Sequence, residues 1–341
     1  MVHNTGKAGN EPLVSVVVPA YNAEKTIQNT VDDILSQTYH YYELIIIDDG
    51  SRDGTSEICD SFAARDSRIR VIHQTNKGLS CARNTGTREA AGQYITYIDS
   101  DDRIDKRYLE YLVRAVTETG ADVACGRIDR LREGTEPGEG NEEYAVTLFD
   151  RKECIRQMLT GKEITVSACC RLVPTDRMIA CPFQEGAYYE DLSNTYKVNL
   201  MSEKTAFINV PLYHYVMRGG SITGQKQITE KQCRDYYDAV NSCSEEIIAR
   251  FPDLEKDAAV LKAKDYMSLY LNIHRCPEQN DELAAIEQDV IRWMGNIWMK
   301  AARNSMAPQN VRLRAMLFGI SPRLYEKMYY LGIGIKGKKI R

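Results

Sequence analysis

Three carboxylates follow one apolar segment of the chain within four positions. Residues 94–98 alternate apolar and small side chains, which predicts a strand, and Asp99, Asp101 and Asp102 come directly after it. Like charges this close repel, so such a cluster needs a cation or strong hydrogen-bond donors nearby. The hard cations Mg²⁺ and Mn²⁺ prefer carboxylate oxygens and often share their coordination shell with substrate phosphates. The alternative is an acidic turn that caps a helix starting near Asp105.

The segments upstream of this cluster predict the sheet that positions it. Continuous Val and Ile runs indicate strands buried on both faces, and their alternation with helical stretches predicts a doubly wound, mostly parallel α/β sheet. Ligands bind such sheets at the carboxyl ends of the strands, where Tyr21, Asp49 and the acidic cluster fall. The predicted strands are 14–19, 43–48, 69–73 and 94–98, and the helices between them begin near residues 23, 53 and 79.

Four ordered motifs at these strand ends carry a family resemblance. They are Val16-Val-Val-Pro19-Ala-Tyr21-Asn22, Asp48-Asp49-Gly50-Ser51-Arg-Asp53-Gly54-Thr55, Asn76-Lys77-Gly78-Leu-Ser80-Cys-Ala82-Arg83-Asn84 and Asp99-Ser100-Asp101-Asp102. They resemble the inverting family 2 glycosyltransferases, which have a GT-A fold. The resemblance is close over residues 13–105 and looser to about residue 225. It implies a nucleotide-sugar donor, Mn²⁺ or Mg²⁺, and transfer of one sugar with inversion at its anomeric carbon.

The resemblance implies roles for the residues at the strand ends. Asp101 matches the family's metal-binding carboxylate, and Asp99 matches the residue that contacts the ribose or a metal-bound water. A metal that bridges two phosphates neutralises their charge and makes the nucleotide diphosphate a better leaving group. The resemblance also implies Asp49 as the contact to the nucleotide base, with Pro19 and Tyr21 as the wall beside that base. Arg83 and Ser100 are the other implied donor contacts. For Arg83, a solvated arginine on a helix face is the alternative.

Glu190 and Asp191 form a second acidic pair, which precedes an amphipathic stretch to about Met201. The acceptor hydroxyl must lose a proton as it attacks the sugar, which requires a base. The pair resembles the family's E-D motif, so the resemblance implies Asp191 as the base and Glu190 as a supporting residue. The alternative is an acidic pair at a helix N-terminus, stabilised by the helix dipole.

The segment Tyr213-His214-Tyr215-Val216-Met-Arg218-Gly-Gly-Ser221 resembles the part of this family that closes the active site. The resemblance implies His214 as a third metal ligand and Arg218 and Ser221 as diphosphate contacts, which suits a guanidinium and a hydroxyl. Val216 stands where the family often has arginine, which removes one phosphate contact. A packed core histidine is the alternative for His214.

The organisation of the chain changes after residue 225. We expect a catalytic domain over residues 1–225, with a nucleotide-sugar half at 13–105 and an acceptor half at 106–225, and a helical region over residues 226–341. Four helical stretches are predicted in that region, at 225–250, 252–275, 280–304 and 309–331. The segment 133–140 is predicted to be an acceptor-contacting loop or a disordered insertion.

The last 42 residues are strongly basic. Residues 300–341 contain ten Lys and Arg and one acidic residue, a net charge of +9, whereas the whole chain has −4. Mixed with Leu, Phe and Tyr, these cations favour a helix at an anionic membrane surface. An ordinary helix packed on the catalytic domain stays open, and the acidic remainder of the chain argues against nucleic acid as a partner.

The composition indicates a cytoplasmic protein, peripheral to the inner face of the membrane if the basic tail binds lipid. The ten cysteines lack metal-site spacing and are expected to be reduced core thiols. No apolar run is long enough for a transmembrane helix, and residues 1–11 contain no signal-peptide hydrophobic region.

The sequence therefore predicts an inverting transferase that moves a sugar from a nucleotide donor, most simply a UDP-sugar, to a glycan or lipid-linked glycan of a cell-surface polysaccharide. A nucleotidyltransferase that makes the activated sugar is an alternative, although Ala20-Tyr21-Asn22-Ala23 stands where those enzymes carry a Gly-rich loop. A non-catalytic sugar-nucleotide-binding protein is the other.

Overall fold

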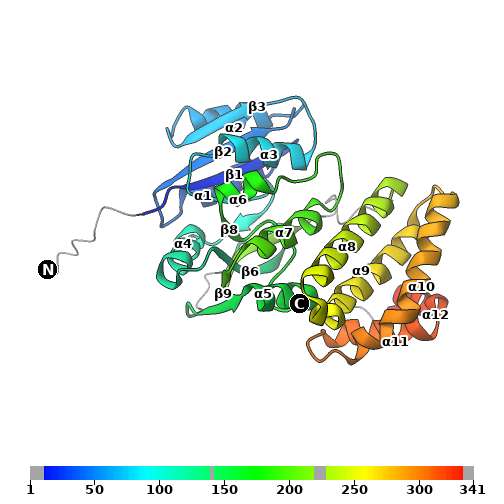
Figure 1. Cartoon of the computed structure of the whole chain (residues 1–341). Coiled ribbons are helices and arrows are strands. Elements are labelled where there is room, and N and C mark those ends of the chain that lie inside the picture. The colour runs from blue at the N-terminus through cyan, green and yellow to red at the C-terminus, as the bar shows by residue number, and fades with distance from the viewer. Residues whose placement is uncertain (1–10, 139–141, 219–227, 333–341) are drawn as a thin grey trace. The chain divides into compact units, whose positions relative to one another are not determined.

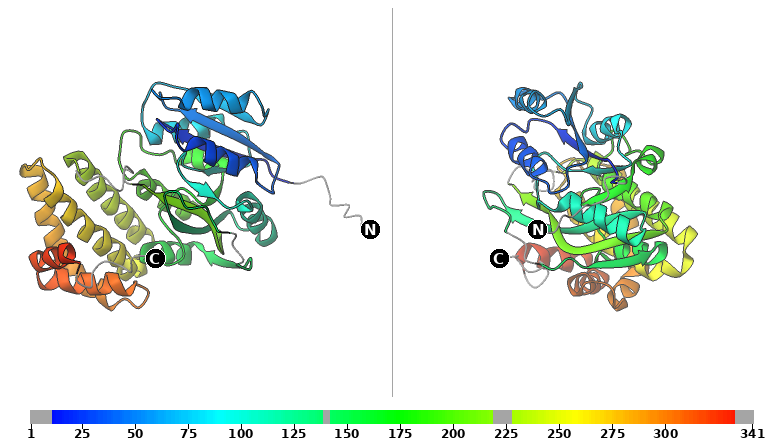
Figure 2. Two further views of the ribbon diagram at one scale, coloured as in Figure 1. Left: turned by 180° about the vertical axis from the view of Figure 1, so that it is seen from behind. Right: turned by 90° about the vertical axis from the view of Figure 1, so that its left-hand side faces the viewer.

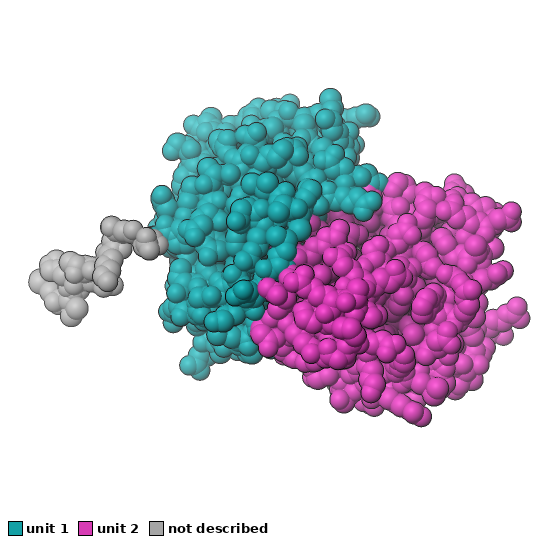
Figure 3. Space-filling model, in the orientation of Figure 1, with its two compact units in different colours: residues 1–149, 168–186, 201–217 teal, residues 150–167, 187–200, 218–341 magenta. Residues whose placement is uncertain are grey.

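The computed structural model describes residues 11–138, 142–218 and 228–332 (Figure 1). These residues divide into two compact units, coloured separately in Figure 3. Unit 1 comprises residues 1–149, 168–186 and 201–217, and unit 2 comprises residues 150–167, 187–200 and 218–341. The chain thus passes from one unit to the other several times. The predicted domain boundary at residue 225 lies outside the described residues.

Unit 1 is built on a mixed sheet with the strand order β3-β2-β1-β4-β8-β6-β9-β5, and β7 pairs with β9. Strands β1 to β4 run parallel, as the sequence predicts, whereas β8 is antiparallel to both β4 and β6. The strands are β1 (Val14–Ala20), β2 (Tyr42–Asp48), β3 (Ile69–His73), β4 (Tyr94–Tyr97), β5 (Arg103–Ile104), β6 (Val123–Arg132), β7 (Val146–Asp150), β8 (Arg171–Pro174) and β9 (Lys204–Met217).

Helices cover both faces of the parallel half of this sheet. Helices α1 and α2 lie on one side of β1 and β2, and α3 lies on the other (Figure 2). Helix α3 approaches β1 closely at Gly86, where an added Cβ would lie 2.3 Å from Cγ1 of Val17. The helices of unit 1 are α1 (Ile27–Leu35), α2 (Thr55–Ala63), α3 (Leu79–Glu89), α4 (Tyr108–Thr119) and α6 (Thr175–Ala180). Every residue of β1 is buried, which explains why its sequence is a continuous apolar run.

Unit 2 is helical, and its long helices α8, α9 and α10 lie side by side (Figures 1 and 2). Thr229 and Gln232 form a capping box at the start of α8, and the Asn280 side chain accepts from Leu283 N at the start of α10. The helices are α5 (Arg151–Thr160), α7 (Glu190–Met201), α8 (Glu230–Arg250), the 3₁₀ turn η2 (Pro252–Leu254), α9 (Glu255–Arg275), α10 (Asp281–Arg303), α11 (Gln309–Ile320) and α12 (Pro322–Leu331).

The basic C-terminal stretch forms two helices, so the prediction of one helix over 309–331 is wrong. Pro322 has no N–H to continue α11, and the Ser321 side chain accepts from Leu324 N to start α12. The inner sides of both helices are packed: Phe318 and Tyr325 are buried, and the Phe318 ring meets Tyr270 of α9 edge-on at 5.1 Å. Both helices are therefore packed, but these contacts are to helices of unit 2 and not to the catalytic domain, as the alternative had it.

All ten cysteines lie among the described residues without a disulfide, and nine are buried. Among the described helices, none combines the length and the apolar character that crossing a membrane requires.

Candidate active site

The loops that follow β1 and β2 are bonded to each other at the carboxyl edge of the sheet. Asp49 N donates to Ala20 O at 2.8 Å, and Arg52 N donates to Asn22 Oδ1 at 2.8 Å. The structure therefore brings Asp49 close to Pro19 and Tyr21, the two residues predicted to flank the nucleotide base. Pro19 is buried at the end of β1, while the Tyr21 ring is 47% exposed and free to stack on a flat partner.

Asp48 holds the turn after β2 in shape. Its carboxylate accepts from Ser51 N, Ser56 Oγ and His73 Nδ1 at 2.6–3.0 Å. Burial opposes ionisation of Asp48, but these hydrogen bonds outweigh it and hold its pKa below the ordinary value. Gly50 in this turn has a φ of +71°, and an added Cβ would lie 2.7 Å from Asn76 N. Only glycine fits there without strain.

Asp49 ties the loop before α3 to the strand end. Its Oδ1 accepts from Gln74 Nε2 and Lys77 N, and its Oδ2 accepts from Gly78 N at 2.7 Å. The side chain is buried. Asp49 thus helps to shape the carboxyl edge of the sheet, where it is also predicted to contact the nucleotide base.

Arg83 lies on the buried side of α3, so the alternative of a solvated helix-face arginine is wrong. Only 1% of its surface is exposed, its Nη2 contacts Asp99 Oδ1 at 2.9 Å, and its guanidinium lies 5.3 Å from the Phe183 ring centre. The side chain of the neighbouring Asn84 accepts from the backbone N of Phe183 and donates to the backbone O of Phe183. Helix α3 therefore fixes both the first carboxylate of the acidic turn and the segment around Phe183.

The acidic turn after β4 is anchored by β9. Tyr213 donates its hydroxyl to Asp102 Oδ2 at 2.7 Å and accepts from Asp99 N, while Val216 N donates to Asp102 Oδ1 at 2.8 Å. Burial, and then the negative charge of Asp99, raise the pKa of Asp102 to about 8. Asp102 is buried, whereas Asp99, Ser100 and Asp101 are half-buried.

The sequence did not reveal that Asp102 and Tyr213 position this turn. Two features of the sequence could have indicated it: Asp102 is a third carboxylate beside the two predicted metal ligands, and Tyr213 directly precedes His214.

His214 lies in β9 opposite Arg103 of β5 and Asp129 of β6. Its Nε2 is buried and makes no hydrogen bond to the described residues. Burial lowers its pKa, and the nearby charges of Asp129 and Asp105 only partly oppose this, so the ring is held neutral. Successive side chains of a strand point to opposite faces, so His214 faces away from the side on which Tyr213 meets the acidic turn.

The predicted metal ligands do not form a three-residue group. In the part of the chain that the structure describes, no three His, Cys, Asp or Glu residues are arranged to hold a metal ion. Asp99 and Asp101 are brought together by the turn, but His214 is not grouped with them.

Glu190 and Asp191 occupy the first turn of α7, in unit 2. The preceding Tyr189 has a φ of +60°, which is uncommon for a residue with a side chain. Its ring stacks on Tyr236 of α8 with ring centres 4.2 Å apart and an interplanar angle of 11°. Tyr236 in turn donates to Asp265 Oδ1 of α9 at 3.0 Å. The acidic pair is thus held from the helical region of unit 2.

The remaining predicted residues are less fully described. Arg218 is half-buried at the end of a described stretch, and Ser221 lies outside the described residues. In the predicted loop 133–140, Glu136 contacts Arg103 of β5 at 3.0 Å, and residues 139–140 lie outside the described residues.

Known proteins resemble this chain in both sequence and fold. Residues 15–176 match the model of the family described as glycosyl transferase family 2. The glycosyltransferase GlyG of Streptococcus pneumoniae serotype 4 is 36% identical over 222 residues, which cover 62% of this chain and 72% of GlyG. The chain belongs to glycosyl transferase family 2. This glycosyltransferase is also 33% identical over 267 residues to GlyA of the same organism, covering 75% of this chain and 38% of GlyA.

The fold of this glycosyltransferase is shared with a solved structure. Residues 1–349 of S. aureus TarS, crystallised with UDP-GlcNAc, superpose with a TM-score of 0.62 at 20% identity, covering 94% of this chain and 92% of that one. The predicted α/β GT-A fold with a helical C-terminal region is confirmed.

Proposed function

We propose that this glycosyltransferase transfers a sugar from a nucleotide-diphosphate donor, a UDP-sugar, with inversion at the anomeric carbon. The grouping of Pro19, Tyr21, Asp49 and Asp99 at the carboxyl ends of β1, β2 and β4 is the observation that carries the proposal. The shared fold of TarS, whose crystal contains UDP-GlcNAc, supports UDP as the nucleotide. The acceptor is a hydroxyl of a glycan or a lipid-linked glycan in the synthesis of a cell-surface polysaccharide.

The acidic turn suits a divalent cation. Asp99 and Asp101 offer half-buried carboxylate oxygens, the donor type that Mn²⁺ and Mg²⁺ take. Such an ion supplies positive charge that makes the diphosphate a better leaving group. In this proposal Asp101 and Asp99 hold it, and Arg83 fixes the orientation of Asp99 through their ion pair. His214, the third ligand that the resemblance implies, is not grouped with these two carboxylates in the structure.

Asp191 acts as the base, and Glu190 helps to orient the acceptor. The acceptor oxygen forms a bond to the anomeric carbon while the bond from that carbon to the phosphate oxygen breaks. The hydroxyl proton passes to Asp191, and the electron pair of the broken bond leaves with the nucleotide diphosphate. Arg218 and Ser221 contact that diphosphate. The sugar carries oxocarbenium character in the transition state, as in glycoside hydrolysis.

Calorimetry with UDP, with and without Mn²⁺, tests the donor site. We expect the wild-type chain to bind UDP only when Mn²⁺ is present. The Asp101→Ala variant should bind UDP weakly whether or not Mn²⁺ is present. Asp176→Ala, an exposed carboxylate in the first turn of α6, is the matched control and should behave as wild type. Affinity for UDP that is independent of metal in the wild type would contradict the metal site. His214→Asn in the same titration shows whether the imidazole contributes.

A transfer assay separates the reaction classes. A panel of UDP-, GDP-, CMP- and dTDP-sugars is incubated with acceptor mixtures, and release of the nucleotide is compared with pyrophosphate exchange. We expect acceptor-dependent release of UDP. Pyrophosphate exchange without transfer would instead indicate a nucleotidyltransferase, and neither activity would indicate a binding protein.

A further inference from the structure

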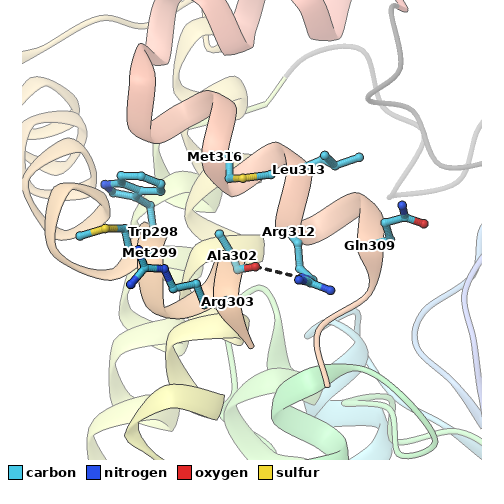
Figure 4. Close-up of a pocket in the computed structure, with 8 residues that line it drawn as sticks. All are labelled: Trp298, Met299, Ala302, Arg303, Gln309, Arg312, Leu313 and Met316. Atoms are coloured by element: carbon cyan, nitrogen blue, oxygen red, sulfur yellow. Dashed lines mark hydrogen bonds between the residues drawn. The ribbon is translucent and has the colours of Figure 1, made fainter. Parts of the chain in front are cut away.

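A hollow of about 620 Å³ lies between the end of α10 and α11, within unit 2 (Figure 4). Trp298 of α10 forms one wall, where an added Cβ on Gly319 of α11 would lie 2.4 Å from the indole Cδ2. The indole therefore packs on bare backbone, and glycine at this position permits the contact. The lining residues are Trp298, Met299, Ala302, Arg303, Gln309, Arg312, Leu313 and Met316.

An apolar stripe on α11 continues from this hollow. Leu313, Met316 and Ile320 are spaced at i, i+3 and i+7, which places them on one side of the helix. All three are exposed, Ile320 to 72%, although Phe318 on the inner side of the same helix is buried. Helix α11 is thus apolar on both sides. Contiguous exposed apolar surface on a protein marks an interaction site more often than chance placement.

The charge at the hollow is of one sign. Arg303 and Arg312 are the charged residues among its lining, and no carboxylate lines it. Arg312 Nε donates to Ala302 O at 2.9 Å, which holds its guanidinium at the rim (Figure 4). The occupant must therefore combine apolar and anionic character.

We propose that the α10–α11 face, defined as Trp298, Met299, Arg303, Arg312, Leu313, Met316 and Ile320, binds the surface of an anionic phospholipid membrane. Leu313, Met316 and Ile320 enter the boundary between headgroups and acyl chains, and the two arginines contact lipid phosphates. Stable protein partners use about 20–30 residues on each side, many more than this face offers. A few inserted side chains with flanking cations suffice for reversible membrane binding.

Vesicle co-sedimentation of the full chain tests this inference, which does not depend on the proposed reaction. Vesicles of phosphatidylcholine alone are compared with vesicles that also contain phosphatidylglycerol, at low and at high salt. We expect binding to the anionic vesicles that weakens with salt. The double variant Leu313→Glu/Met316→Glu, and separately Arg303→Glu, should bind roughly tenfold or more weakly.

Matched controls come from exposed residues outside this face. Ile179→Glu replaces an exposed apolar side chain of unit 1, and Arg250→Glu reverses an exposed cation at the end of α8. Both should bind vesicles as wild type does. Point substitutions are preferable to removal of α11 and α12, because Phe318 and Tyr325 are buried. If the double variant is misfolded by circular dichroism, Arg303→Glu decides the test.

The chain carries its own spectroscopic reporter. Its two tryptophans, Trp293 and Trp298, both lie in α10, and Trp298 lines the hollow. In a Trp293→Phe background, a blue shift of Trp298 emission with anionic vesicles is the expected result. Equal binding by wild type and the Leu313→Glu/Met316→Glu variant, or no binding by the wild type, would overturn the proposal. Loss of a homodimer in that variant, without vesicle binding by either, would assign the face to a second copy.

Discussion

Asp191 and Asp281 are comparable acids, because each lies in the first turn of a helix of unit 2. Both interact favourably with a helix dipole, worth roughly 0.3–1 kcal/mol. Only Asp191 is proposed to take a proton, and an amide preserves its shape without basicity. We therefore expect Asp191→Asn to bind UDP normally and to lose turnover by ~10²–10⁴-fold. Steady-state kinetics and calorimetry on the same preparation measure both properties.

The matched variant Asp281→Asn separates catalysis from the interaction of a carboxylate with the helix dipole. It should lower the midpoint of thermal unfolding slightly and leave turnover unchanged. Turnover of Asp191→Asn above about a tenth of wild type, with binding intact, would place the base elsewhere.

Tyr236 is expected to position the acidic pair without touching the substrate. Its ring stacks on Tyr189, which holds a strained φ of +60° directly before Glu190. Tyr236→Leu removes the stack, and we expect kcat to fall by roughly 10- to 100-fold with little change in the donor KM. Tyr236→Phe keeps the ring and loses the bonds of the hydroxyl, including that to Asp265, so its kcat should stay near wild type. A Tyr236→Leu variant that is less stable but keeps its kcat would show that the stack is only structural.

At the scale of elements, His274 of α9 joins two other helices. Its Nε2 contacts Glu287 of α10 at 2.9 Å, and its Nδ1 contacts Glu326 of α12 at 2.8 Å. Burial lowers the pKa of His274, but the two carboxylates outweigh burial and raise its pKa above the ordinary value. Because the pKa is higher folded than unfolded, the stabilisation is complete below about pH 6.5 and is lost as the pH rises through the folded pKa.

We therefore expect the difference in unfolding midpoint between wild type and His274→Gln to be largest below about pH 6.5 and to shrink at higher pH. Thermal unfolding across that range measures it. His40→Gln, which replaces an exposed histidine, is the control and should show no such trend. A wild-type advantage that is constant with pH would contradict an ionic role for His274.

The parallel strands could be predicted from sequence because each is a contiguous apolar run. β1 and β2 were expected at 14–19 and 43–48, and both agree with the structure to within one residue at each end. The polar sequence of α3 gave no comparable guide, since Arg83, Asn84 and Thr87 are all buried. Local patterning shows which residues are apolar. It does not show which polar side chains are buried because they have an ion-pair partner.

At the scale of the whole molecule, the second half of the sheet depends on pairings between distant segments. Strand β9 pairs with both β6 and β5, and the bond from Tyr213 to Asp102 joins residues 111 apart. No local period encodes such partners. The residues of the candidate site could therefore be predicted, because they follow predicted strands. The contacts that hold the acidic turn could not be predicted.

The dependence of the acidic turn on β9 has a consequence for the order in which the protein matures during synthesis. Asp102 and its partner Val216 are 114 residues apart. At ~5–20 residues per second, a ribosome needs roughly 6–23 s to travel between them. During that interval the Asp102 carboxylate lacks the hydroxyl and the N–H that accompany its burial. A nascent chain that stalls before Val216 should therefore leave the turn hydrated and open, and unit 1 should close only when its last strand leaves the exit tunnel.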